Sequence, residues 1–309
     1  MIELNKIYNE DCLEGMKRIE DKSVDMILCD LPYGTTNNAW DVIIDTEKLF
    51  SEYKRICKQN TNVLLFCQQP FANLLMNSIY ESEFSHQLIW IKKNTTRFMS
   101  TKNLPLSQYE MILCFRLNKY ANKQQHKWLR DHFTNELGNS DYSVKELEKL
   151  IPNRSAGHWF RYSGDFRIPT EKNYKRLQEI TKHFKTPYID IRRKFIQEKT
   201  NLCTYNGNNE RDILQFDRDK ENYHPTQKPI LLFEHLIKIY SNEGETVLDN
   251  CMGSGTTAIS ALNTNRNFIG FEMDKEYYEL SNKRILIKAA EISDKMVARE
   301  ASQDALKLT

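Results

Sequence analysis

Two short segments, far apart in the chain, hold the residues whose types and spacing could do chemistry. The first is Asp30-Leu31-Pro32-Tyr33, which ends an apolar run, and the second is a glycine turn at 249–255. In the first segment, the Asp30 carboxylate and the carbonyl of Leu31 or Pro32 can each accept one hydrogen of an amine. Tyr33 can stack on a planar ring, and Pro32 fixes the turn without adding a competing N–H.

Such a pair of acceptors has a defined chemical consequence. When both amine hydrogens are drawn out of the plane of an aromatic ring, the nitrogen lone pair becomes free to attack an activated methyl group. A strong general base is then unnecessary, although Asp30 can receive the proton afterwards. The first segment therefore predicts a site for an exocyclic amine, and the alternative is a strand-to-turn boundary with no chemical role.

The second segment has the pattern of a nucleoside-binding turn. Gly253 and Gly255 let the backbone approach a ligand where a Cβ would collide, and Thr256 suits the first turn of a following helix. Glu272 ends the next predicted strand, 17 residues after Gly255. An acid at an offset of ~20 residues meets ribose hydroxyls in related folds. The alternative is a tight strand-to-helix turn with no ligand.

Asp249 favours one cofactor over the others. A carboxylate at the strand end disfavours a dinucleotide pyrophosphate but favours the positively charged methionine end of S-adenosylmethionine. The turn also lacks the Gly-x-Gly-x-x-Gly spacing of NAD-dependent enzymes, and no Gly-Lys-Ser/Thr of a P-loop nucleotidase occurs. Together the two segments predict methyl transfer from S-adenosylmethionine to an amine.

The elements around these segments must bring them together. The predicted strands lie at 24–29, 62–66, 86–91, 110–115, 246–248 and 267–271. The predicted helices lie at 46–58, at 71–79, and onward from residues 229, 255 and 275. Alternation of this kind predicts an α/β fold with a mostly parallel sheet and helices on both of its faces.

The middle of the chain differs in composition. Residues 116–200 contain 19 Lys or Arg and 10 Asp or Glu, although the net charge of the whole chain is only +2. Local positive charge suits phosphate contact, and the alternative is a solvated helical surface. Helices are predicted from 169 and from 188, and no strong strand is predicted. We therefore divide the chain into 1–116, an inserted region 117–222, and 223–309 with a polar helical tail.

Bulk properties exclude several classes of protein. No apolar stretch among the 309 residues approaches the ~18–20 residues that span a bilayer, and the polar N-terminus is not a signal peptide. The seven cysteines include no Cys-x-x-Cys pair, which predicts buried thiols in place of disulfides or a zinc site. His224 and His235 have no carboxylate partner in a metal-binding pattern, so no metal is predicted. We expect a cytoplasmic protein without membrane contact.

At this point the chain resembles the amino-group DNA methyltransferases, in the β-type order where the catalytic motif precedes the cofactor motif. The matching segments, which cover about 1–116 and 223–285, are 8–13, Asp30-Leu31-Pro32-Tyr33, His224-Pro225-Thr226-Gln227-Lys228-Pro229, 249–255 and Glu272. The resemblance implies a Rossmann-like, S-adenosylmethionine-dependent methyltransferase sheet with an inserted, mainly helical target-recognition region. It also implies double-stranded DNA as the partner, with the target base flipped out of the helix.

The resemblance also implies roles for individual residues. Asp30, Pro32 and Tyr33 would be catalytic. The cofactor-binding residues would be Asp11 at the adenine, Asp30, Thr226 and Lys228 beside the methionine moiety, Asp249, Cys251, Gly253, Gly255 and Thr256 in the loop, and Glu272 at the ribose. In the insert, Trp128, Trp159, Phe160, Arg161 and Tyr162 mix aromatic and basic character, which suits stacking and phosphate contact.

Several alternatives stay open. Aspartate at the first position of the tetrapeptide favours adenine N6 as the target in this family, and the nearest alternative is cytosine N4. Less favoured alternatives are an amine of RNA or protein, and a DNA-binding protein that has lost catalysis. Family members of this order often form homodimers, and we expect residues 96–108 to provide that contact.

Overall fold

The computed structural model describes residues 2–35, 41–78, 83–96, 105–118, 127–151, 156–160, 168–200, 205–207, 210–221, 223 and 227–307. The chain divides into two compact units. Met1–Asn118 and Thr204–Thr309 form the larger unit, and Lys119–Cys203 form the smaller one. The larger unit therefore joins the two segments that carry the predicted chemistry.

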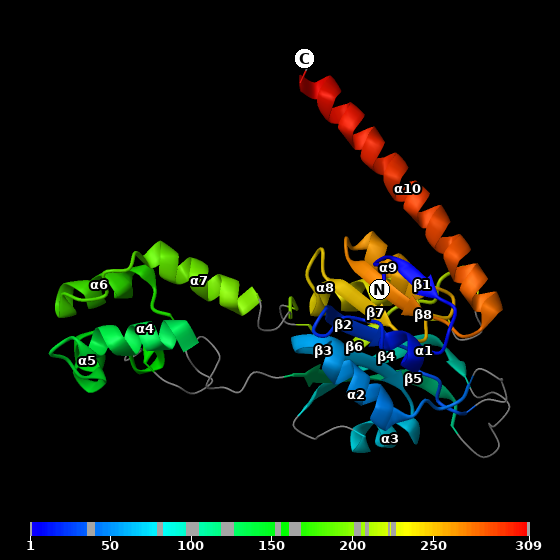
Figure 1. Cartoon of the computed structure of the whole chain (residues 1–309), viewed down its shortest axis with the longest axis horizontal. Coiled ribbons are helices and arrows are strands. Elements are labelled where there is room, and N and C mark those ends of the chain that lie inside the picture. The colour runs from blue at the N-terminus through cyan, green and yellow to red at the C-terminus, as the bar shows by residue number, and fades with distance from the viewer. Residues whose placement is uncertain are drawn as a thin grey trace. The chain divides into compact units, whose positions relative to one another are not determined.

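The larger unit is built on an eight-stranded sheet (Figure 1) with the order β1-β8-β7-β2-β3-β5-β4-β6. Neighbouring strands are parallel except for the pairs β3–β5 and β4–β5, so β5 runs against the others. The strands are β1 Lys6–Tyr8, β2 Val24–Cys29, β3 Cys57–Cys67, β4 Phe84–Thr96, β5 Ser107–Leu117, β6 Ile213–Gln215, β7 Thr246–Asp249 and β8 Asn267–Phe271.

All six predicted strands are present, and the predicted α/β fold is confirmed. Strands β1 and β6 were not predicted, because three residues are too few to display a period of two. They form the two edges of the sheet. Because β6 pairs with β4, the smaller unit ends at Cys203, before the predicted boundary at residue 222.

The central strands are buried on both faces, as expected of parallel strands under helices. Successive side chains of a strand point to opposite faces, so each strand contributes to two cores. One core contains Ile27, Cys29, Val63 and Leu65 with residues of α2. The other contains Met26, Leu28, Leu64 and Phe66 with residues of α8.

The helices of the larger unit are α1 Cys12–Met16, α2 Thr46–Ile56, α3 Phe71–Asn77, α8 Ile230–Tyr240, α9 Thr256–Asn263 and α10 Lys275–Lys307. Helices α2 and α3 lie on one side of the sheet and α8 and α9 on the other (Figure 1). Helix α2 shows why these sequences are helical. The Asp45 carboxylate caps its first turn by accepting from Lys48 N at 3.1 Å, and Leu49, Tyr53 and Ile56 form a buried stripe.

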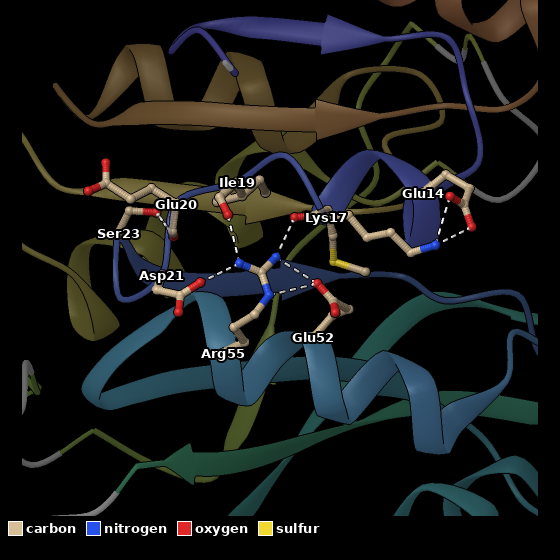
Figure 2. A network of polar contacts seen from close by, with 9 residues as sticks. Glu14, Lys17, Ile19, Glu20, Asp21, Ser23, Glu52 and Arg55 are labelled. Carbon is tan, nitrogen blue, oxygen red and sulfur yellow. Dashed lines mark hydrogen bonds and ion pairs between the residues drawn. The ribbon is translucent and has the colours of Figure 1, made fainter.

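One arginine ties α2 to the loop that follows α1. The Arg55 guanidinium donates to the carbonyls of Met16 and Ile19, each at 2.8 Å, and pairs with Asp21 at 2.6 Å and Glu52 at 2.7 Å (Figure 2). These bonds satisfy carbonyls at the end of α1 that have no partner within that short helix. The loop leading into β2, and hence Asp30, is held in place by this network.

The smaller unit is helical and has its own core. Its helices are α4 Lys127–Gly138, α5 Val144–Leu150, α6 Glu171–Thr181 and α7 Tyr188–Thr200, with a 3-10 turn at Ala156–Trp159. Aromatic side chains, among them Phe133, Tyr174 and Phe184, fill the space between them. Helices α6 and α7 were predicted, whereas α4 and α5 were not. A capping box between Ser143 and Glu146 begins α5 and is a signal that sequence reasoning could have used.

Two bulk expectations can be compared with the described residues. The six described cysteines are free, and five of them are buried, as predicted. None of the helices in the described part of the chain is long and apolar enough to cross a membrane. Of the segment expected to contact a second copy, residues 97–104 lie outside the described ranges.

Candidate active site

The carboxyl edge of the sheet opens into a cavity of about 320 Å³. Parallel strands place the residues that follow them at one edge, which is where ligands bind in open α/β sheets. Residues after β1, β2, β7 and β8 line this cavity, together with residues before α8. The two predicted segments, which are distant in the sequence, thus share one cavity.

Asp30 is the first residue after β2, and two side chains hold its carboxylate. The Tyr33 hydroxyl donates to Oδ1 at 2.7 Å, and the Lys228 ammonium forms an ion pair with Oδ2. Burial raises the pKa of Asp30, and the nearby Glu110 carboxylate raises it further, while Lys228 and Tyr33 act in the opposite direction. Asp30 is thus a buried anion whose proton affinity depends on its neighbours.

Tyr33 has a more specific position than the sequence indicated. Its ring stacks on Phe71, with ring centroids 5.4 Å apart, and its hydroxyl is directed to Asp30. Burial raises the pKa of Tyr33, so the hydroxyl stays protonated and continues to donate. The residue therefore links the cavity wall to the carboxylate, in addition to offering an aromatic surface.

Glu110, which sequence reasoning missed, belongs to the same site. It lies near the start of β5, and because β5 is antiparallel its start reaches the edge where the other strands end. Its carboxylate is 3.2 Å from Lys228 Nζ and 2.6 Å from Lys92 Nζ. Although burial acts against the charge, the two ammonium groups hold the pKa of Glu110 below its usual range.

The glycine turn has the geometry that the sequence predicted. Gly253 has φ +52 and Gly255 has φ +85, which are left-handed conformations that glycine adopts without strain. A Cβ on Gly253 would meet no atom within 4 Å, because that position opens on the cavity. Gly255 is the N-cap of α9 and packs on Ser281 instead, so its role is structural and it does not line the cavity.

Asp249 is buried at the end of β7. Its Oδ1 accepts from Cys251 N at 3.0 Å, and its Oδ2 accepts from the Thr257 hydroxyl. Burial raises the pKa of Asp249 to about 6, and these hydrogen bonds oppose the rise. A carboxylate that costs free energy to ionise in this position would be stabilised by a cation in the cavity.

Glu272 follows β8 on the opposite side of the turn. Its carboxylate accepts from Gly253 N at 2.7 Å and from Asp274 N at 2.8 Å, which orients it beside the glycine turn. Burial raises its pKa. The predicted offset of the ribose acid from the glycines therefore corresponds to direct contact between the two features.

The other predicted residues fall into two groups. Asp11, Cys251 and Thr256 line the cavity; the Asp11 side chain also caps α1, accepting from Leu13 N at 2.8 Å. Pro32 and Lys228 line it as well. Thr226 lies outside the described residues, as do Arg161 and Tyr162 of the insert. In the described part of the chain, no group of His, Cys, Asp or Glu side chains is arranged to hold a metal ion.

Comparison with known proteins agrees with this geometry. A family model described as DNA methylase matches residues 24–283, which include both chemical segments. The chain therefore belongs to the N6/N4 DNA methylase family and is a DNA methyltransferase of that family. Its fold is the α/β sheet of S-adenosylmethionine-dependent DNA methyltransferases.

Curated relatives align over most of the chain at modest identity. The type II methyltransferase M1.MboII of Moraxella bovis is 27% identical over 91% of this chain and 96% of its own length. The DNA adenine methyltransferase YhdJ of Escherichia coli K12 is 26% identical, over 92% of this chain and 83% of its own. A shorter match of 66 residues to M.BglI of Bacillus subtilis is 50% identical, and there the chain spans only 19% of the relative.

Solved structures share the fold. The complex of M1.HpyAVI with SAM (S-adenosylmethionine) superposes with a TM-score of 0.52 at 20% identity, covering 90% of this chain and 98% of that one. A DNA modification methylase from Thermus thermophilus, also complexed with S-adenosylmethionine, gives a TM-score of 0.51 at 17% identity, with 92% and 93% covered.

Proposed function

We propose that this protein transfers a methyl group from S-adenosylmethionine to adenine N6 in double-stranded DNA. One observation carries the proposal: Asp30, with Tyr33 bonded to it, faces the same cavity as the glycine turn with Asp249 and Glu272. An amine acceptor and a nucleoside site in one cavity are what methyl transfer to a base requires. The family places that base in DNA.

The methyl donor is S-adenosylmethionine, and the cavity fits it in three respects. Gly253 leaves room along the turn, Glu272 offers a carboxylate for the ribose hydroxyls, and Asp249 offers a negative charge for the cationic methionine end. When bound, this cofactor supplies a methyl carbon activated by a positively charged sulfur, which keeps the bonding electron pair when the amine takes the methyl group.

Asp30 and the backbone beside it act on the target amine. Asp30 accepts one amine hydrogen and a carbonyl of the Leu31-Pro32 turn accepts the other, so that the nitrogen lone pair is directed at the methyl carbon. After the new N–C bond forms, the nitrogen is positively charged and releases one proton to the Asp30 carboxylate. The raised pKa of Asp30 suits it to take that proton.

The choice of adenine rests on Asp30 at the first position of the tetrapeptide, together with the adenine activity named for the relative YhdJ. Because N6 lies inside the base stack of a duplex, the base must be flipped into the cavity. The smaller unit supplies the sequence contacts in this proposal. Residues 116–200, which include most of it, carry 19 Lys or Arg against 10 Asp or Glu, and such an excess favours the DNA backbone.

The test is mass spectrometry of nucleosides from unmethylated duplex DNA, incubated with the protein and methyl-labelled S-adenosylmethionine. We expect labelled N6-methyladenine, and none with the Asp30→Ala variant. Labelled N4-methylcytosine would replace the target base and keep the mechanism. Label in RNA or protein alone, or no transfer while the cofactor still binds, would refute the proposal.

A further inference from the structure

Four charged side chains form an alternating row that leads from the sheet into the cavity. Lys92 Nζ lies 2.6 Å from Glu110, Glu110 lies 3.2 Å from Lys228 Nζ, and Lys228 forms an ion pair with Asp30. The side chains of Lys92, Glu110 and Lys228 are 4%, 10% and 6% exposed. Lys92 comes from β4, Glu110 from β5, Asp30 from the end of β2, and Lys228 from the segment before α8.

Such a row is expensive to bury. Each ion loses several kcal/mol of hydration, and well-packed apolar residues often replace buried ion pairs without loss of stability. The row therefore contributes little to folding, and its retention beside the reactive carboxylate needs another reason. Its members also alternate in sign, so Lys228 has a carboxylate on either side.

The position of Lys228 creates a specific requirement for the proposed reaction. Both oxygens of Asp30 are engaged, Oδ1 by the Tyr33 hydroxyl and Oδ2 by Lys228. An incoming amine needs one of these oxygens, and Lys228 would then be a buried ammonium without its partner. An unpaired buried charge costs far more than a paired one.

Glu110 meets this requirement. We propose that Glu110 is a positioning residue that takes over Lys228 when the target amine binds, so that Asp30 presents a free carboxylate oxygen to the amine. This inference rests on the proposed function. Lys228 then moves between two carboxylates that it already contacts, while Lys92 keeps Glu110 in place. No bond is made or broken in this transfer; one ion pair is exchanged for another.

The charges around Asp30 allow a test by pH. The groups that act on Asp30, or that it acts on, are Tyr33, Lys228, Glu110, Asp249, Cys29 and Cys67. Of these, Glu110 is an anion that raises the pKa of Asp30. In Glu110→Gln this influence is lost and Lys228 has only Asp30 as a charged partner, so the pKa of Asp30 falls.

The experiment compares kcat against pH for the wild type and Glu110→Gln with duplex DNA and S-adenosylmethionine. Asp30 must be ionised to accept the amine, so the acid limb of kcat follows its pKa. We expect kcat to fall by ~10- to 100-fold, the scale of a misplaced reacting group, with KM for the cofactor little changed. We also expect the acid limb to move to lower pH.

A matched control separates this effect from damage to the fold. Glu52→Gln removes a partly buried carboxylate that pairs with Arg55 away from the cavity (Figure 2). It is expected to lower stability and leave the acid limb unchanged. A purely structural role for Glu110 would give the Glu52 result: less active protein with an unmoved limb, which would overturn the inference.

A second readout does not need catalysis. In protein labelled with carboxyl-¹³C aspartate, the Asp30 signal is assigned by its loss in Asp30→Asn, and its titration midpoint is measured in the wild type and Glu110→Gln. A lower midpoint in Glu110→Gln supports the inference, and an equal or higher midpoint refutes it. Wild-type protein that methylates no DNA would refute the proposed function instead, and this titration would still decide whether Glu110 sets the charge on Asp30.

Discussion

Asp249→Asn should stabilise the cofactor-free protein while weakening its hold on S-adenosylmethionine. The reason is that Asp249 is buried and its pKa is raised to about 6 from an ordinary value of ~3.9. Asparagine keeps both hydrogen bonds. Its oxygen can accept from Cys251 N, and its amide can donate to the Thr257 hydroxyl, which reverses its own role.

The magnitude and its pH dependence follow from linkage. A carboxyl with a raised folded pKa destabilises the folded state above its unfolded pKa, and this cost disappears as pH falls towards ~4. The two pKa values of ~3.9 and about 6 give a cost of ~3 kcal/mol at pH 7.5 and ~1.5 kcal/mol at pH 5. Asp249→Asn removes this cost, so its advantage over the wild type should roughly double between pH 5 and pH 7.5.

The assay is urea unfolding at both pH values, with hydrogen exchange of β7 and β8 reporting on the larger unit. Asp217→Asn is the control, since that side chain is 69% exposed and should give no difference. Calorimetric titration should show cofactor affinity of Asp249→Asn reduced by roughly tenfold or more, because a charge pair in the cavity is lost. A variant that is less stable than the wild type at pH 7.5, or offset equally at both pH values, would refute the reasoning.

Three other substitutions have defined outcomes. Tyr33→Phe removes a donor to Asp30 and should lower kcat by about tenfold and move its acid limb to higher pH, opposite to Glu110→Gln; an unmoved limb in the pH profile would contradict this. Gly253→Ala should cost ~1–2 kcal/mol in urea unfolding, because φ is +52, and should weaken cofactor binding in calorimetry. Arg55→Met should cost ~2–3 kcal/mol of unfolding free energy and leave cofactor affinity per folded molecule unchanged.

Much of the sheet could be predicted because its central strands are buried on both faces. Val24–Cys29 and the centre of Cys57–Cys67 are continuous apolar runs, and such runs separated by amphipathic segments specify alternating strands and helices. The direction of β5 could not be predicted in this way. Periodicity indicates that a segment is a strand, whereas its direction depends on pairing with β3 and β4.

The same limit explains which parts of the site were found. Asp30, Asp249 and Glu272 each follow a parallel strand, so the sequence order of strand and acid places them at one edge. Glu110 precedes most of its strand, and in a parallel sheet it would lie at the opposite edge. Lys228 was predicted beside the cofactor, but its ion pair with Asp30 depends on that antiparallel strand and on the path into α8.

The charges of the cavity explain how one site can serve a cationic cofactor and a polyanionic substrate. Among the described residues that line it, seven are carboxylates and one, Lys228, is an ammonium. This surface attracts a sulfonium and an amino group and repels phosphate. A flipped base carries no charge and can enter alone, while the phosphates of its duplex stay outside and find positive charge elsewhere on the chain. Because Glu110 holds Lys228 near Asp30, the base meets its acceptor without bringing a counterion of its own.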